Sequence, residues 1–142
     1  MNKKYTGQCA CGAVTYGFDT KPTFIANCHC TDCKRASGGE MATFAAVPDT
    51  DFAVFGGSTK SFPYGPNTET CAGQGLNRVF CTNCGSRVFT NNLKDFPGIV
   101  FVQEGTLNRL DEWFAPNTEI FTWSRQPWVR PLDLPQFDHR PK

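Results

Sequence analysis

The amino-acid sequence predicts a mostly β domain that carries metal-binding cysteine knuckles. Short apolar or alternating runs recur along the chain, separated by turn-forming clusters of Gly, Pro and Asn, a spacing typical of all-β folds. The chain also has eight cysteines, several of them grouped at spacings that suit a metal ion. Its 142 residues suit a single domain, 1–142.

Strands are expected wherever an apolar run lies between two turn signals. The most regular run is "GIVFVQEG" at 98–105. The runs at 77–81 and 86–90 flank "CTNCG" like the two arms of a hairpin. The remaining predicted strands are 13–18, 41–47, 52–56 and 119–124.

One segment favours a helix instead. In "TDCKRAS" at 31–37, Thr31 is expected to cap the helix and Asp32 suits its first turn. The proline-rich tail at 131–142 is expected to lie extended over the surface.

Charge and hydropathy limit the possible partners. Fourteen basic residues against thirteen acidic ones leave a net charge of +1, which gives no broad attraction to nucleic acid or to an anionic membrane. No apolar run follows Lys3 and Lys4 as in a signal peptide, and none approaches the length of a membrane span. We therefore expect a cytoplasmic protein, whose reduced cysteines serve as metal ligands or reactive groups before they form disulfides.

Two of the cysteine groups together predict one closed four-sulfur site. A C-x-C pair lies near the N-terminus and a C-x-x-C pair lies far along the chain, and Gly12 and Gly85 follow them. A glycine at this place lets the backbone turn and aim its N–H groups at the sulfurs. A closed site of this kind is structural, because it contributes folding free energy and leaves no free position. The expected ligands of this structural zinc are Cys9, Cys11, Cys81 and Cys84.

A C-x-C-x-x-C trio predicts a second zinc site, with three protein ligands and one open position. That arrangement is typical of catalytic zinc. Two alternatives remain: Cys71 closes the site and makes both zincs structural, or one of the three thiols is only a buried cysteine. The expected ligands of the second zinc are Cys28, Cys30 and Cys33.

Several neighbouring residues have expected roles around the trio. Three thiolates on a divalent ion leave a charge of −1, which Lys34 and Arg35, or Arg87 if it is near, could offset. His29 lies between two ligands, so its side chain should point away from the metal and face a supporting group or solvent. Cys71 has no partner at ligand spacing and is expected to be a small apolar filler.

Four segments, in this order, resemble the glutathione-dependent formaldehyde-activating enzyme family, also called the CENP-V/GFA domain. They are "YTGQCACGAVTY", "CHCTDCKRASGG", "FCTNCGSRVF" with the later "GTLN", and "PNTEIFTWSRQPWV". The resemblance covers the chain from about Tyr5 to Phe137. It implies an Mss4-like β-tent fold with the two zinc sites described above.

The resemblance also implies an activity. The family joins formaldehyde to the thiol of glutathione, or releases it, as S-hydroxymethylglutathione, which makes the predicted enzyme a zinc-dependent carbon–sulfur lyase with a small-molecule thiol or glutathione adduct as its partner. Arg35, Arg78 or Arg87 could hold the carboxylates of glutathione. The chain departs from the family pattern at Asn108, where Asp is frequent, and at Glu119, where His is frequent.

Two other functions remain as alternatives. One is a non-catalytic zinc-binding module that docks a partner through the aromatic C-terminal block. The other is detoxification of a different electrophile or thioester at the same metal site. An open fourth zinc position would separate the enzymes from the docking module.

Overall fold

The computed structural model describes residues 2–63, 75–108 and 114–141, which form two β-sheets, one short α-helix and 3-10 turns. The small sheet has the strand order β1-β2-β5 and the large sheet has the order β10-β3-β4-β9-β8-β7-β6. β10 runs parallel to β3, and every other pairing is antiparallel. The small sheet contains β1 (Tyr5–Gln8), β2 (Thr15–Phe18) and β5 (Ala53–Gly56). The large sheet contains β3 (Ile25–Cys28), β4 (Ala42–Pro48), β6 (Thr59–Pro63), β7 (Asn77–Cys81), β8 (Arg87–Asn91), β9 (Ile99–Gln103) and β10 (Thr118–Ile120).

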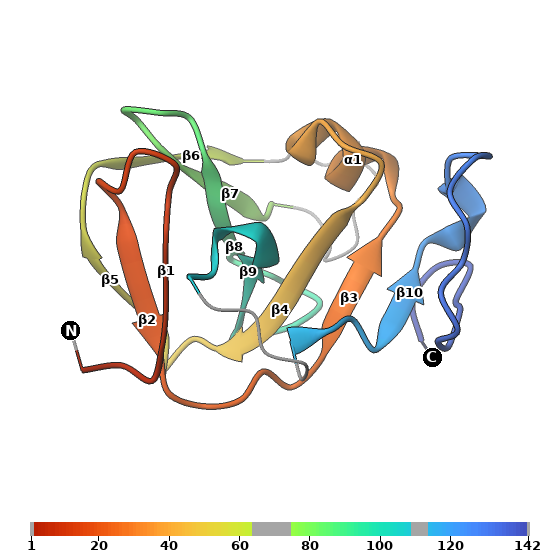
Figure 1. The fold of residues 1–142 in the computed structure, drawn as a ribbon, viewed down its shortest axis with the longest axis horizontal. Coiled ribbons are helices and arrows are strands. Elements are labelled where there is room, and N and C mark those ends of the chain that lie inside the picture. The colour runs from red at the N-terminus through yellow and green to blue at the C-terminus, as the bar shows by residue number, and fades with distance from the viewer. Residues whose placement is uncertain (1, 64–74, 109–113, 142) are drawn as a thin grey trace.

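The main core lies between the two sheets (Figure 1). The small sheet contributes Tyr16 and Phe18, both fully buried, and the large sheet contributes Val47 and Val102. The hydroxyl groups of Tyr16 and Thr106 share a hydrogen bond at 2.7 Å, so the buried hydroxyl group of Tyr16 is satisfied. This core fixes the small sheet over one face of the large sheet.

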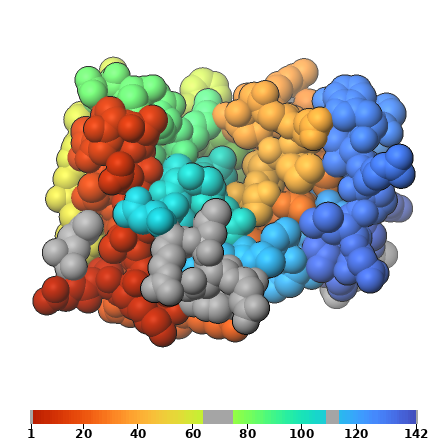
Figure 2. Space-filling model, in the orientation of Figure 1, coloured from red at the N-terminus to blue at the C-terminus, as the bar shows by residue number. Residues whose placement is uncertain are grey.

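The opposite face of the large sheet carries a second cluster of buried residues, and the cysteine trio belongs to it. In this cluster Phe44 stacks on Phe101, with ring centroids 4.0 Å apart. Helix α1 (Thr31–Ser37) lies over the end of the large sheet at which β3 ends, and the C-terminal segment lies beside the helix (Figures 1 and 2). The two faces of one sheet therefore serve different purposes: one holds the sheets together and the other surrounds three thiols.

Most of the predicted strands are confirmed, with three omissions. β1, β3 and β6 were not predicted. β3 is buried along its whole length and so shows no alternation of apolar and polar residues, while β6 is exposed along its whole length and its sequence is mostly polar. Two predicted strands also end early. β9 gives way to the 3-10 turn η1 (Glu104–Thr106), and β10 is followed by η3 (Thr122–Ser124).

The predicted helix is confirmed at 31–37, but its cap is different. Cys30 is the N-cap residue and its sulfur accepts a hydrogen bond from the Cys33 N–H, so the prediction of Thr31 as the cap was wrong. The reason is that a thiol side chain at the N-cap can satisfy the same orphan donor that a hydroxyl group would. Gly38 ends the helix in a left-handed conformation.

The C-terminal tail has little regular structure but is tied to β10. The backbone of Glu119 receives a hydrogen bond from Phe137 and donates one to Pro135, and Phe121 donates to the carbonyl of His139. In the described part of the chain, no helix combines the length and apolar character needed to cross a membrane.

Candidate metal centres

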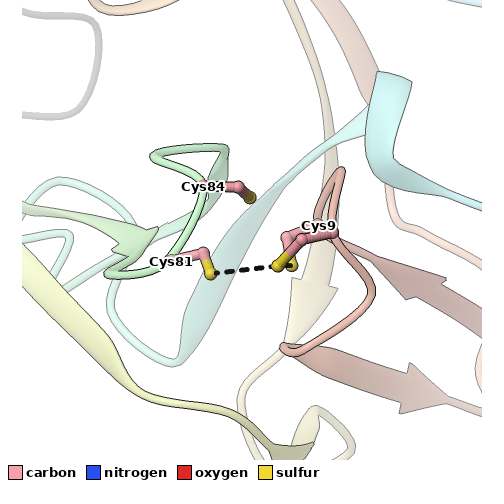
Figure 3. Close-up of side chains that lie close together, drawn as sticks. Cys9, Cys81 and Cys84 are labelled. Carbon is pink, nitrogen blue, oxygen red and sulfur yellow. Dashed lines mark hydrogen bonds between the residues drawn. The ribbon is translucent and has the colours of Figure 1, made fainter.

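The first cluster consists of four thiols, and they lie where two distant turns meet. Their sulfur atoms all lie within 4.8 Å of one another. The sulfurs of Cys9 and Cys11 are 3.6 Å apart, and those of Cys11 and Cys81 are 3.8 Å apart. A tetrahedron with zinc–sulfur bonds of about 2.3 Å has sulfur–sulfur edges of about 3.8 Å, so this donor set fits zinc. Figure 3 shows Cys9, Cys81 and Cys84 directed toward one another from the two turns.

Both turns aim backbone N–H groups at the sulfurs, as their glycines predict. The Val14 N–H donates to Cys9 Sγ at 3.2 Å, and the Asn83 N–H donates to Cys81 Sγ at 3.3 Å. Gly12 and Gly85 both have a positive φ, of 79° and 77°, which lets each turn close behind its second cysteine. These donors favour the thiolate form, which is the form that binds a metal.

The local groups also lower the pKa of individual thiols. The nearby Ser86 hydroxyl group, together with backbone N–H groups, lowers the pKa of Cys84 to about 5. Burial alone would raise the pKa of Cys9, but hydrogen bonds from the Val14 N–H and from neighbouring thiols outweigh it and lower this pKa. Cys84 and Cys9 therefore favour the thiolate form that binds a divalent cation. At Cys81, the backbone N–H donors are outweighed by burial and by the hydrogen bonds with these two thiols, which raise its pKa.

The second cluster brings together the trio at the junction of β3 and α1. Cys28 ends the strand, Cys30 caps the helix, and Cys33 lies in its first turn. Their sulfurs lie within 4.8 Å of one another, and all three residues are at most 1% exposed. Among residues 2–63, 75–108 and 114–141, no fourth His, Cys or carboxylate joins this group. Three thiols with this spacing fit zinc with a position left for another ligand.

Arg78 is the cation that contacts the second cluster. It is 4% exposed on β7, and its Nη2 atom donates to Cys33 Sγ at 3.7 Å. A buried guanidinium group is costly unless it is paired, and a thiolate is a suitable partner. Arg78 is therefore placed to offset the negative charge that the trio carries when its thiols are ionised.

The basic residues expected to do this from the sequence lie elsewhere. Lys34 donates to the Ser124 carbonyl at 2.7 Å and to Gln126 at 3.3 Å, which ties α1 to the C-terminal segment. Arg35 is exposed on the helix. Sequence reasoning gave Arg78 only a substrate role, although a charged residue inside the apolar run "NRVFC" was a signal of a buried partner.

His29 is fully buried and pairs with Glu119, so a solvent-facing position is wrong, and its supporting role beside a metal stays a prediction. Its Nε2 atom donates to Glu119 Oε1 at 2.8 Å. Burial alone would raise the pKa of Glu119, but hydrogen bonds from Gln136, His29 and the Leu132 N–H, with the charge of Arg125, lower it to about 2. The ionised carboxylate of Glu119 thus joins the loop between Cys28 and Cys30 to the C-terminal segment. The sequence showed Glu119 only as a departure from a pattern.

Cys71 lies outside the residues that the structure describes, so its role as a filler or as a fourth ligand stays a prediction. No disulfide joins any two of the seven described cysteines.

Comparison with known proteins supports both the fold and the family. A crystal structure of a Rhodobacter sphaeroides protein has a similar fold, with a TM-score of 0.59 and 22% identity, over 75% of this chain and 91% of that one. No curated protein matches the chain significantly in sequence. The family model described as "Glutathione-dependent formaldehyde-activating enzyme" matches residues 4–124, most of the chain and all seven described cysteines. The chain therefore belongs to the glutathione-dependent formaldehyde-activating enzyme family.

Proposed function

We propose that the protein is a zinc-dependent carbon–sulfur lyase, which forms or cleaves S-hydroxymethylglutathione or a related thiol adduct. The observation that carries the proposal is a buried trio of thiols that has a guanidinium partner and no fourth ligand among the described residues. We also propose a cytoplasmic location, where cysteines stay reduced and can serve as metal ligands.

We propose two zinc ions per chain, with different tasks. The first cluster would hold its zinc through Cys9, Cys11, Cys81 and Cys84, and this ion would stabilise the fold. The second cluster would hold its zinc through Cys28, Cys30 and Cys33. When bound there, zinc would supply a positive charge that keeps a substrate thiol ionised near neutral pH.

The reaction is the addition of a thiolate to an aldehyde. The sulfur attacks the carbonyl carbon of formaldehyde and forms the carbon–sulfur bond. The π electron pair moves to the carbonyl oxygen, which takes up the proton that the thiol gave up, so the product is a neutral hemithioacetal. Cleavage is the same sequence in reverse, and neither direction needs an oxidant or a reductant.

The chain contributes charge balance and rigidity to this reaction. Arg78 offsets the excess negative charge of the thiolates, which keeps the site close to neutral when a substrate thiolate approaches. The pair of His29 and Glu119 fixes the loop between Cys28 and Cys30, so that its thiols stay in place. Burial among Phe44, Phe101 and other apolar residues excludes water from the sulfurs.

The experiment is to measure zinc per chain by elemental mass spectrometry, and adduct formation by exchange NMR with 13C-formaldehyde and glutathione. The wild type and Cys30→Ser are compared. We expect two zinc ions in the wild type, one in the variant, and loss of catalysed exchange in the variant. Serine is a good N-cap residue, so α1 should survive the change. Retention of both the second zinc and the activity in Cys30→Ser would refute the mechanism.

A docking module is the alternative, and one observation favours it. Trp123 and Trp128 are 52% and 67% exposed on the C-terminal segment, beside the exposed Leu132. Exposed aromatic side chains are common at protein interfaces. Wild-type protein with a full second site but no catalysed exchange with any thiol adduct would support this alternative. Exchange with another aldehyde or thioester alone would indicate a different electrophile.

A further inference from the structure

A cavity of about 530 Å³ lies between the two cysteine clusters. Its walls come from the end of α1, from the turn that follows Cys84, and from η1 with the end of β9. Figure 2 shows these segments around a hollow on the visible face: orange for the helix, green for the turn and teal for η1. No role has so far been given to this cavity.

The register of the large sheet places Arg87 on the same face as the trio. Cys28 pairs with Ala42, and two residues further along β4 Phe44 pairs with Gln103, so these four residues share one face. A bulge between Val79 and Phe80 shifts the pairing of β7 with β8, so that Arg87 lies opposite Phe80.

The same bulge brings Arg87 to the face of Arg78. Phe80 lies two residues after Arg78 and therefore shares its face. Arg78 pairs with Thr90, which pairs with Phe101 on the face of the second buried cluster. Both arginines are thus directed to the side of the sheet that holds the thiols, from successive positions of the β7–β8 hairpin.

The cavity lies directly beside the second cluster. Its wall includes Ala42, the cross-strand neighbour of Cys28. It also includes Ala36, which lies one helical turn after Cys33. A molecule in the cavity would therefore contact a spatial neighbour of two of the three proposed ligands, Cys28 and Cys33.

The charge of the cavity selects an anionic ligand. Arg87 is its one cationic lining residue, and none of its lining residues is acidic. The hydroxyl groups that line it already have protein partners: Ser86 accepts from the Ala10 N–H, and Thr106 donates to the Gln103 carbonyl. In the described part of the chain, no acidic residue pairs with Arg87, and its buried Nη1 atom has no hydrogen-bond acceptor. An enclosed guanidinium N–H without an acceptor points to a ligand that supplies one.

We propose that Arg87 binds a carboxylate of the thiol substrate in this cavity and so makes the site selective for carboxylate-bearing thiols. The inference rests on the proposed function, because it assigns one end of the substrate whose sulfur reacts at the trio. It also decides among the three arginines considered from the sequence. Arg78 is taken by Cys33, and Arg35 is exposed on the helix, outside the cavity lining. A guanidinium group can hold a carboxylate through two parallel hydrogen bonds.

The test measures binding separately from catalysis. S-methylglutathione keeps both carboxylates but has no free thiol to offer the metal, so its binding reports on the cavity alone. Calorimetric titration compares wild type, Arg87→Gln and Arg35→Gln, with the zinc content and the melting temperature of each protein recorded. We expect Arg87→Gln to bind on the order of 10–100-fold more weakly, as for the loss of a charge-assisted hydrogen-bonded pair, and Arg35→Gln to bind like the wild type. Arg87→Lys should fall between them.

A second arm uses the reaction. In exchange NMR, Arg87→Gln should raise the KM for glutathione by a similar factor, with kcat little changed, and should raise the KM for 2-mercaptoethanol, which has no carboxylate, far less. Equal binding of S-methylglutathione by wild type and Arg87→Gln, or no binding by the wild type, would overturn the proposal. Arg87-dependent binding in a protein that catalyses no exchange would keep this inference and refute the proposed function instead.

Discussion

The two cysteine clusters differ in how the chain surrounds and neutralises them. In the first, two of four thiols are exposed, and backbone N–H groups and side-chain hydroxyl and amide groups contact the sulfurs. In the second, all three thiols are buried and a guanidinium group contacts Cys33. When four thiolates surround a divalent cation at the surface, water can solvate their net negative charge. Three thiolates inside an apolar cluster need a cation from the protein.

The two clusters also differ in how they contribute to the stability of the fold. The first joins residues 9–11 to residues 81–84 and closes a loop of about seventy residues, so it holds the small sheet to the large one. The second lies within six consecutive residues at one strand–helix junction, which hydrogen bonds already fix. The first cluster should therefore matter for folding and the second for chemistry.

The largest expected effect separates the clusters by stability. Cys81→Ser should remove a ligand from the closed site and cost several kcal/mol, a large part of a typical domain's stability of about 5–15 kcal/mol. Cys30→Ser should cost much less, because serine keeps the N-cap of α1. Urea unfolding followed by circular dichroism measures both. Equal losses in the two variants would remove the distinction between a structural and a chemical cluster.

The next effect concerns the support of the second cluster. Glu119→Gln should lower the free energy of unfolding by about 3 kcal/mol at pH 7, because a buried ionised group with His29 and Arg125 as partners is lost. The folded-state pKa of about 2 lies below the ordinary value of 4.5, so this stabilisation is present above pH 4.5 and is lost as the pH falls toward 2.

Melting temperatures between pH 3 and 8 test this prediction. The difference between wild type and Glu119→Gln should shrink below pH 4.5. Glu40→Gln is a matched control, because Glu40 is exposed. Its side chain accepts a hydrogen bond from the indole N–H of Trp128. A constant difference across the pH range would show that the carboxylate is not ionised in the folded protein.

A smaller effect addresses charge balance at the second cluster. Arg78→Met should weaken metal binding there by about 10–100-fold, or roughly 1.4–2.7 kcal/mol, while the first cluster keeps its affinity. Arg78→Lys should retain most of the affinity, because it keeps the positive charge. Competition with a chromophoric chelator measures the two metal equivalents separately. If Arg78→Met weakened both equivalents alike, its role would be in folding and not in the charge of the trio.

The smallest effect comes from Glu104, which precedes two residues that line the cavity between the clusters. Burial raises the pKa of this carboxyl group to about 7. The folded state therefore holds a proton that the unfolded state releases above pH 4.5, and stability falls as the pH rises from about 4.5 to 7. Glu104→Gln removes this loss.

Melting temperatures at pH 5 and pH 8 measure it. The melting temperature of Glu104→Gln should exceed that of the wild type at pH 8, and the two should differ little at pH 5. An equal difference in melting temperature between the two proteins at pH 5 and pH 8 would contradict the raised pKa of Glu104.

The fold class and the cysteine groups could be predicted from local patterns in the sequence. Turn residues between apolar runs predicted β7, β8 and β9, and local spacing predicted α1 at 31–37, because these signals act between neighbours in the chain. Cysteine spacing with Gly12 and Gly85 also predicted which thiols meet, since each knuckle is itself a local turn.

The surroundings of those thiols depend on contacts between distant segments, which local patterns do not predict. Glu119 reaches His29 across 90 residues because β10 pairs with β3, and Arg78 reaches Cys33 across 45 residues although three strands separate β7 from β3 in the sheet. The bulge that directs Arg87 to the same face depends on one extra residue in the pairing of β7 with β8. Contacts between distant segments depend on which strands pair and in which register, and neither is encoded in local spacing.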